Sequence, residues 1–156
     1  FKCDWSSDVC SSDLLAGRRL NDGMGSYIAG EVIKLMVKNN ITIKGARILL
    51  LGITFKENCP DLRNTRILNI VNELTEYNCQ VDVYDPWASS EEAKNEYGIT
   101  PIELPECGVY DAIILSVAHH QFVTMGSNRI HSFGRSKHIL YDLKSVLPLG
   151  ESDLRL

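Results

Sequence analysis

The amino-acid sequence predicts an α/β fold, a Rossmann-like doubly wound parallel sheet preceded by a long helix. Two short runs, residues 46–54 and 110–118, are mostly apolar and rich in Ile and Leu. Such runs are too short for buried helices and are typical of strands covered on both faces of a parallel sheet. Helical apolar spacing between the predicted strands indicates right-handed βαβ crossovers. With 156 residues, of which 44% are hydrophobic, the chain is long enough to enclose one core.

Residues 1–14 are expected to lie outside this fold, as a non-native or disordered segment. They are dominated by Ser, Asp and Cys, show no apolar period and contain the near-repeat SSDVC and SSDL. The segment resembles translated adapter sequence, so it is set aside from the fold prediction. A genuine disordered tail is the alternative interpretation.

A helix is predicted over residues 21–38, with Asn21 or Asp22 as its N-cap. Its apolar residues form two neighbouring stripes, which are Ile28, Val32, Leu35 and Met36 on one and Ala29, Ile33 and Val37 on the other. A helix that is apolar on two stripes is expected to be buried on more than one side. We therefore expect it to contact a partner beyond its own domain.

A βαβ unit follows this helix. The strand at 46–54 leads into a polar loop at 55–64, and an amphipathic helix then begins at Ile67 and ends near Asn78. The later elements are expected as a strand at 80–86 that stops at Pro86, a helix at 89–97, a short strand or edge segment at 99–104, the strand at 110–118, a partly helical region at 119–133 and a last strand at 138–144.

Charge and hydropathy exclude several classes of partner. Because 16 Lys and Arg stand against 20 Asp and Glu, the chain offers no basic surface for a nucleic acid or an anionic membrane. No apolar run reaches the roughly 20 residues that span a bilayer, and the N-terminus lacks the order of a signal peptide. We therefore expect a cytoplasmic protein.

The cysteines favour neither a metal site nor a disulfide framework. They are five in number and never form a C-x-x-C pair. Free, mostly buried thiols are expected, since unpaired Cys behaves chiefly as a small apolar residue. No metal site is predicted.

Ligands of a doubly wound sheet bind outside the carboxyl ends of its strands. The loop after the first strand has one glycine at the strand end, Gly52, and nothing like G-x-G-x-x-G, so side chains must hold any phosphate. Lys56 and Arg63 can supply positive charge, and Arg63 lies just before a helix whose first amides favour an anion. Phe55 can add a flat apolar face. The alternative is a solvated loop in which Lys56 and Asp61 form a surface ion pair.

Asp85, His119 and His120 also follow predicted strands. Asp85 lies too far after Gly52 for the acid that binds a cofactor ribose, which usually follows by about 20 residues. Since Pro86 comes next, a turn-forming role is favoured for Asp85. The two histidines have no acidic or cysteine partner at metal spacing, so a helix-start or crevice-lining role is favoured over an acid, base or metal ligand.

The loop after the first strand, G-I-T-F-K-E-N-C-P-D-L-R-N-T, resembles the signature G-x-x-F-K-x-x-x-x-D-x-R-x-[ST] of the UDP-glucose/GDP-mannose dehydrogenase family, in its C-terminal domain. The likeness covers about residues 15–156 and includes L-A-G-R-R-L-N-D-G-M-G-S-Y, V-D-V-Y-D-P-W, Y-D-A-I-I-L-S-V-A-H and Y-D-L-K-S-V-L-P. The motif H-H-Q-F and the ending S-D-L-R-L are most similar to members that act on UDP-N-acetylhexosamines for surface polysaccharides. The resemblance implies a linker and dimerisation helix at 15–40 and a UDP-binding domain at 41–156.

The activity implied by the resemblance is an NAD-dependent oxidation of a UDP-sugar at C6, in which a cysteine captures the aldehyde before a second NAD completes the uronate. The family's cysteine lies in a G-G-x-C segment and its NAD site in a G-x-G-x-x-G domain, and neither occurs in these 156 residues. We therefore expect no catalytic residue here and no activity from this chain alone. Cys59 follows a different motif, and only Lys56 nearby could lower the pKa of a thiol, so Cys59 is not assigned as the nucleophile.

Four site residues are implied by position in the family motifs. Phe55 and Lys56 match residues that hold the UDP moiety, with Lys56 near its phosphates. Lys144 matches a substrate-contacting position that is often Arg, and Lys cannot reproduce a bidentate contact. Arg63 matches an arginine that reaches NAD, which is bound mainly by the other domain. Residues 21–39 match the helix that joins the two domains and forms the core of a homodimer.

Two other classes of function remain open. A stand-alone Rossmann-like nucleotide-binding module without catalysis would have much the same sequence, because this chain alone would behave like one. A receiver-like interaction domain needs a phosphorylatable Asp in an acidic cluster, and Asp85 before Pro86 is a poor candidate. An upstream G-x-G-x-x-G domain with a G-G-x-C segment would favour the enzyme.

Overall fold

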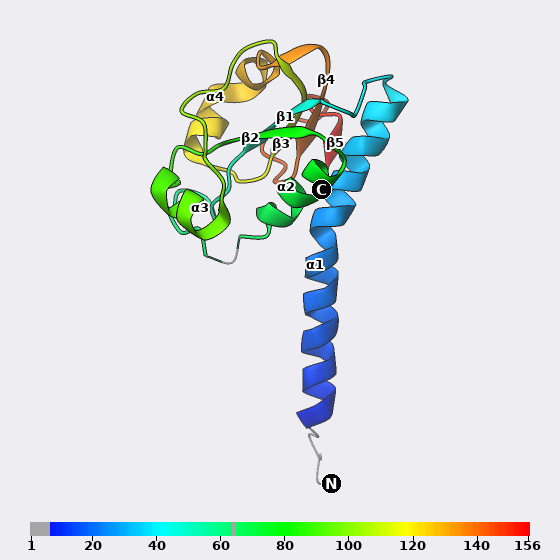
Figure 1. The fold of residues 1–156 in the computed structure, drawn as a ribbon, viewed down its shortest axis with the longest axis vertical. Helices are drawn as coiled ribbons and strands as arrows, with labels where there is room; N and C mark the ends of the chain where they lie inside the picture. The colour runs from blue at the N-terminus through cyan, green and yellow to red at the C-terminus, as the bar shows by residue number, and fades with distance from the viewer. Residues whose placement is uncertain (1–6, 64) are drawn as a thin grey trace.

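The computed structural model describes residues 7–63 and 65–156, with side chains from residue 23 onward. The described residues form a parallel sheet of five strands in the order β2-β1-β3-β4-β5, with helices on both faces (Figure 1). The strands are β1 (Arg47–Leu51), β2 (Gln80–Tyr84), β3 (Tyr110–Leu115), β4 (Gly134–Asp142) and β5 (Leu154–Arg155). The helices are α1 (Ser7–Lys38), α2 (Ile67–Glu76), α3 (Ser90–Tyr97) and α4 (His120–His131). The predicted fold class is confirmed.

Two cores cover the two faces of the sheet. In β1, Ile48 and Leu50 face the core that contains side chains of α1 and α2, whereas Leu49 and Leu51 face the core beneath α4. All four side chains are fully buried. The apolar runs of the sequence are therefore continuous rather than alternating because both faces of these strands are covered.

Of the two possibilities predicted for residues 99–104, a short strand or an edge segment, the structure has the edge segment. Within it, the N–H of Ile102 donates a hydrogen bond of 2.8 Å to the carbonyl of Val83 in β2, but the segment forms no strand. Pro101 has no N–H, so a regular ladder cannot continue through this position. The segment runs along the edge of the sheet without extending it.

The last part of the sheet differs in extent from the prediction. Strand β4 begins at Gly134 rather than at residue 138. Strand β5 was not predicted, and it pairs with β4 through Tyr141 and Asp142. Two residues are too short to show an alternating pattern, so only the folded chain reveals this strand.

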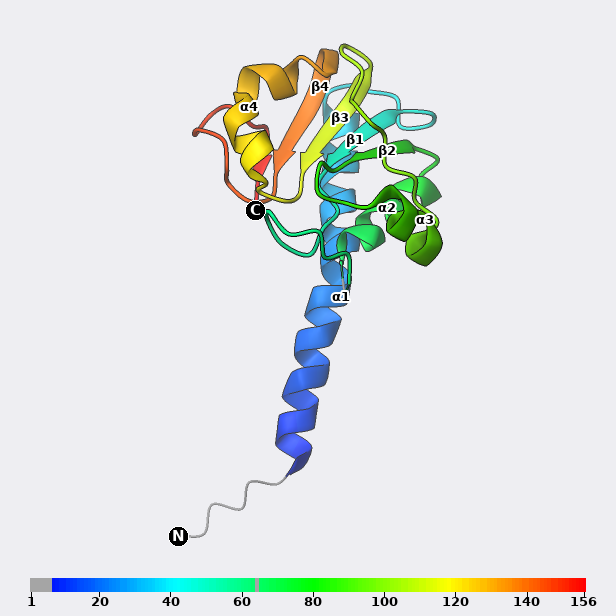
Figure 2. The same cartoon turned by 90° about the vertical axis from the view of Figure 1, so that its left-hand side faces the viewer.

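Helix α1 is longer than the sequence predicted, because it begins at Ser7 rather than near Asn21, although it ends at Lys38 as expected. No proline interrupts this stretch of sequence. Its first half projects away from the sheet domain and its second half lies along it (Figures 1 and 2). The segment at residues 1–14 was predicted to be non-native or disordered. Its residues 1–6 lie outside the described residues, and its residues 7–14 belong to α1. That the segment is non-native stays a prediction. Among the described helices, none is long and apolar enough to cross a membrane.

One side of α1 is buried within the chain. Ile28, Val32 and Met36 are at most 4% exposed and belong to the core that α1 shares with α2 and the sheet. Gly25 permits this close approach, because a Cβ there would lie 2.5 Å from the Cβ of Asn69 in α2. On the second apolar stripe, Ala29 is also fully buried in this core, whereas Val37 is 59% exposed. The stripe that contains Ile28, Val32 and Met36 is therefore covered within the chain. Only the exposed side of α1 is available to contact a partner.

Candidate ligand site at the carboxyl edge of the sheet

The strand order reverses between β1 and β3, whose carboxyl ends lie side by side. Gly52 follows β1 with a φ of 97°, and a Cβ there would lie 2.6 Å from the Cβ of Val117. Glycine is required at this position for both its conformation and its close contact. Ser116 joins the strand ends by donating to the carbonyls of Leu51 at 2.9 Å and Gly52 at 2.6 Å. This edge is the switch point where doubly wound sheets bind ligands.

The buried carboxylate of Asp85 holds the start of the loop after β1. Its Oδ2 accepts hydrogen bonds from the N–H of Ile53 at 2.7 Å and of Thr54 at 3.1 Å, and its Oδ1 accepts one from the N–H of Trp87 at 2.8 Å. Burial opposes the charged form, yet hydrogen bonds from His119 and these backbone groups hold the pKa of Asp85 below its ordinary value. The predicted turn role is confirmed, and the structure adds the contact with the loop.

His119 is fully buried and connects the loops that follow β1, β2 and β3. Its Nδ1 accepts a hydrogen bond of 3.0 Å from the N–H of Asn58, so the ring proton lies on Nε2. Nε2 lies 3.0 Å from both Asp85 Oδ2 and Thr54 Oγ1, and that hydroxyl donates to the carbonyl of Lys56 at 3.1 Å. Both ring nitrogens are engaged in holding the loop, which argues against acid–base chemistry or metal ligation by His119.

The side chain of Asn58 in turn forms a hydrogen bond with the start of α4. Its Oδ1 accepts a hydrogen bond of 2.9 Å from the N–H of His120, the first residue of that helix. The N-cap residue His119 makes no side-chain capping bond, so Asn58 caps α4 from a distant loop. Asn58 has a φ of 53°, a left-handed conformation that Asn tolerates. The helix-start role predicted for the two histidines is confirmed.

A cavity of about 240 Å³ opens at this edge between α1, the start of α2, the loop after β1 and the end of β4. Phe55, Lys56 and Lys144, three of the four predicted site residues, line it together. Phe55 is 58% exposed, so its ring presents a large apolar surface to whatever enters. The described lining residues include the cations of Lys56, Lys144 and Arg66 and no Asp or Glu, a charge distribution that attracts anions.

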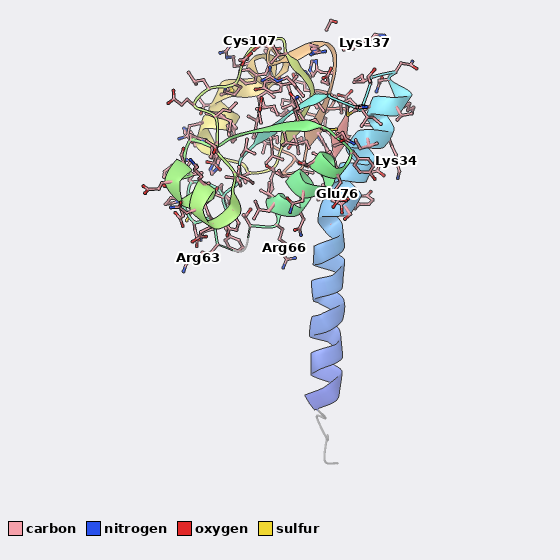
Figure 3. All side chains as sticks on the ribbon, in the orientation of Figure 1. Lys34, Arg63, Arg66, Glu76, Cys107 and Lys137 are labelled. Atoms are coloured by element: carbon pink, nitrogen blue, oxygen red, sulfur yellow. The ribbon has the colours of Figure 1, made fainter. Side chains whose placement is uncertain are left out.

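Arg63, the fourth predicted site residue, is not among the described residues that line this cavity. Its Nε and Nη2 donate to the two carboxylate oxygens of Asp61, each at 3.1 Å, and its side chain is 78% exposed. These hydrogen bonds lower the pKa of the Asp61 carboxyl and raise that of the Arg63 guanidinium. Asp61 therefore pairs with Arg63. The alternative of a solvated loop had paired Asp61 with Lys56 instead. Arg63 and Arg66 extend from the same edge of the domain (Figure 3).

Residues 49–148, which contain most of this site, match the UDP-glucose/GDP-mannose dehydrogenase family, UDP binding domain. The chain belongs to this family. It is 59% identical to UDP-N-acetyl-D-glucosamine 6-dehydrogenase of Pseudomonas aeruginosa and 55% identical to the protein of the same name from Salmonella typhi, each over 92% of this chain and 34% of the relative. The solved structure of UDP-D-ManNAc dehydrogenase from Pyrococcus horikoshii has a TM-score of 0.71 at 26% identity, over 88% of this chain and 31% of that one. The chain thus spans about a third of the length of these relatives.

Sequence reasoning missed part of the lining of this UDP binding domain. Thr65 and Arg66 reach the cavity from the start of α2, and Met24 and Ile28 reach it from α1. Thr65 occupies the last position of the family motif, which was the one available signal for it. The α1 residues carry no such signal, because only tertiary packing brings that helix against the loop.

The described thiols correct one expectation. Cys79 is buried, Cys59 is half-buried and Cys107 is exposed, so only Cys79 fits the prediction of buried thiols. Burial raises the pKa of the Cys79 thiol, with a smaller contribution from Asp111. A raised pKa disfavours the thiolate that a nucleophile requires.

Proposed function

We propose that this chain is the UDP-binding part of an NAD-dependent nucleotide-sugar 6-dehydrogenase that oxidises a UDP-N-acetylhexosamine to its uronate for a surface polysaccharide. The observation that carries the proposal is the cavity at the switch point, where an exposed aromatic ring and three cations occur together and the described lining residues include no Asp or Glu. The 59% identity to the Pseudomonas aeruginosa UDP-N-acetyl-D-glucosamine 6-dehydrogenase supports an acetamido sugar. NAD and UDP-sugars are cytoplasmic metabolites, so the cytoplasm is the proposed compartment.

In this proposal, Phe55 packs on the nucleotide while Lys56 and Lys144 pair with its diphosphate. Lys56 is placed by the bond from the Thr54 hydroxyl to its carbonyl, and Lys144 by the bond from its N–H to Asp142 Oδ1 at 3.2 Å. Asp142 is fully buried at the end of β4. The backbones of both lysines are therefore held in place before a ligand arrives, which reduces the entropy that binding must overcome.

NAD, when bound, accepts the hydride, and we propose that most of its site lies outside this chain. Among the described residues, Arg63 fits a contact with it, because its guanidinium projects from the surface and is 78% exposed despite its bonds to Asp61. Phosphate oxygens can replace carboxylate oxygens as acceptors for the same planar donor group. A facing domain could thus present the diphosphate of NAD to Arg63.

We also propose a homodimer through residues 21–39. Two observations support it, because α1 projects beyond the sheet domain (Figure 2) and Tyr27 and Val37 on this helix are 55% and 59% exposed. Tyr27 and Val37 lie in the half of α1 that runs along the sheet domain, and exposed apolar side chains of this kind are suited to burial against a second copy. Val32 and Met36 are fully buried within the chain, so substitutions there would disturb the fold rather than test the dimer.

A UDP-binding experiment on the full-length protein that contains this chain tests the site. Lys56→Ala should weaken UDP binding by about 1.5–3 kcal/mol, the usual range for a charge-assisted contact, or roughly 10- to 150-fold in Kd by calorimetry. In steady-state kinetics the same variant should raise KM for the nucleotide sugar more than it lowers kcat.

Lys44→Ala is the matched control, because Lys44 lies at the opposite edge of the sheet, beside Gly45 and Ala46. It should bind UDP as wild type does. A wild-type protein that fails to bind UDP would contradict the proposed function, whereas a Lys56→Ala protein with wild-type affinity would contradict the role of Lys56 alone.

A further inference from the structure

The hydroxyl of Thr65 is buried at the cavity without a partner in the described part of the chain. Thr65 is 8% exposed, its Oγ1 has no hydrogen bond to any described residue, and it lines the cavity at the switch point. A buried hydroxyl that forms no hydrogen bond is destabilising, and native proteins contain few of them. An unpaired donor in the wall of an open cavity is therefore a candidate contact for a ligand.

The start of α2 lies directly beside this hydroxyl. Its N-cap residue is Arg66, which makes no side-chain capping bond, and no other described side chain accepts from the first amides of this helix, which runs from Ile67 to Glu76. Unsatisfied amides and the helix dipole favour a negative charge at this end. Lys56 and Arg66 add formal positive charge to the same cavity. The hydroxyl, the amides and the cations thus favour one kind of group, an anion with several acceptor oxygens.

We propose that Thr65 and the N-terminus of α2 bind a phosphate group of a nucleotide ligand, with the Thr65 hydroxyl as donor to a phosphate oxygen. The inference rests on the proposed function and adds to it a binding residue that differs from Lys56 and Lys144. UDP-sugar and NAD both carry a diphosphate, and the shared chemistry is a phosphate at the start of α2. In this arrangement Thr65 lowers the stability of the ligand-free protein in exchange for affinity.

Two substitutions separate the hydroxyl from the shape of the side chain. Thr65→Val replaces the hydroxyl by a methyl group of similar size, and Thr65→Ser keeps the hydroxyl. Thr75→Val is the matched control, because Thr75 lies at the other end of the same helix, where its hydroxyl donates to the Val71 carbonyl at 2.7 Å. The measurements are calorimetric Kd values of the full-length protein for UDP, uridine and NAD, and the thermal midpoint without ligand.

Thr65→Val should weaken the binding of one diphosphate ligand about tenfold, leave uridine unchanged and melt at or above the wild-type temperature, since it removes an unpaired buried hydroxyl. Thr65→Ser should stay within about threefold of wild type, and Thr75→Val within about twofold. A loss confined to UDP assigns the phosphate to the nucleotide sugar, and a loss confined to NAD assigns it to the cofactor.

The proposal is overturned if Thr65→Val binds both UDP and NAD as wild type does, or if it melts several degrees lower, because the hydroxyl would then serve the fold. It is also overturned if uridine weakens as much as UDP, since the hydroxyl would then contact the nucleoside. A failure of the proposed function is distinguishable, because in that case the wild-type protein itself does not bind UDP.

Discussion

The two halves of the loop after β1 use their polar groups in opposite ways. In residues 53–58, the N–H groups of Ile53, Thr54 and Asn58 donate hydrogen bonds to the buried side chains of Asp85 and His119. In residues 61–66, the described cations are exposed and the Thr65 hydroxyl has no described partner. The backbone of the first half is thus held by buried side chains, although Phe55 and Lys56 line the cavity, whereas the described polar side chains of the second half lie at the surface or at the cavity.

Within one motif, the groups that stabilise the fold are therefore different from the groups that are available to contact a ligand. A satisfied buried network is rigid and is strongly destabilised when one member is removed. Exposed and unpaired groups contribute little or unfavourably to stability, so their presence is better explained by binding. Substitutions of the buried Asp85 and His119, which hold the first half, should therefore change stability most, whereas substitutions of the exposed Lys56 and Arg63 should change ligand affinity.

The largest effect is expected from Asp85→Ala. The change removes the acceptor for four backbone N–H groups and for His119 Nε2 in a buried site. Unfolding of the full-length protein in urea should show a loss of about 3–5 kcal/mol, the range for breaking a buried charged contact. Asp61→Asn is the matched control in the second half and should change stability little, because its ion pair is exposed. If the two variants were equally stable, the two halves of the loop would not differ as described.

The same carboxylate should make stability depend on pH in the acid range. The pKa of Asp85 is lower in the folded protein than the value of about 3.9 for an unfolded chain, so its contribution is fully present above pH 4 and is lost as pH falls through the folded pKa. The free energy of unfolding should therefore decrease below pH 4, with a shallower decrease in Asp85→Asn. Parallel curves for the two proteins would show that Asp85 is not the group responsible.

The smallest effect on stability is expected from Arg63→Ala, because this side chain is 78% exposed. Its effect should appear in kinetics instead, as a KM for NAD that rises about tenfold with KM for the nucleotide sugar within twofold of wild type. Lys56→Ala should show the reverse pattern. A rise of both Michaelis constants in Arg63→Ala would mean that the two halves of the motif serve one ligand.

Much of the fold and part of the candidate site followed from local features of the sequence. The apolar runs around β1 and β3 predicted a sheet covered on both faces, and Gly52 predicted a loop close to a strand end. The prediction that Phe55 and Lys56 act together came from the family motif, and the structure places both side chains on one cavity. These features were readable because strand burial and motif spacing are properties of short segments.

Other features were decided only by tertiary structure, because they depend on contacts between residues distant in sequence. Asp85 and His119 looked like separate turn and helix-start residues, and folding joined them into one buried pair at 3.0 Å. The loop motif gave no indication that Arg63 would lie at the surface while Thr65 faces the cavity, since their burial depends on the packing of α1 and α2. The amino-acid sequence alone determined most of the elements and the motif they carry, and only the packing of these elements decided which polar groups are satisfied within the protein and which can bind a ligand.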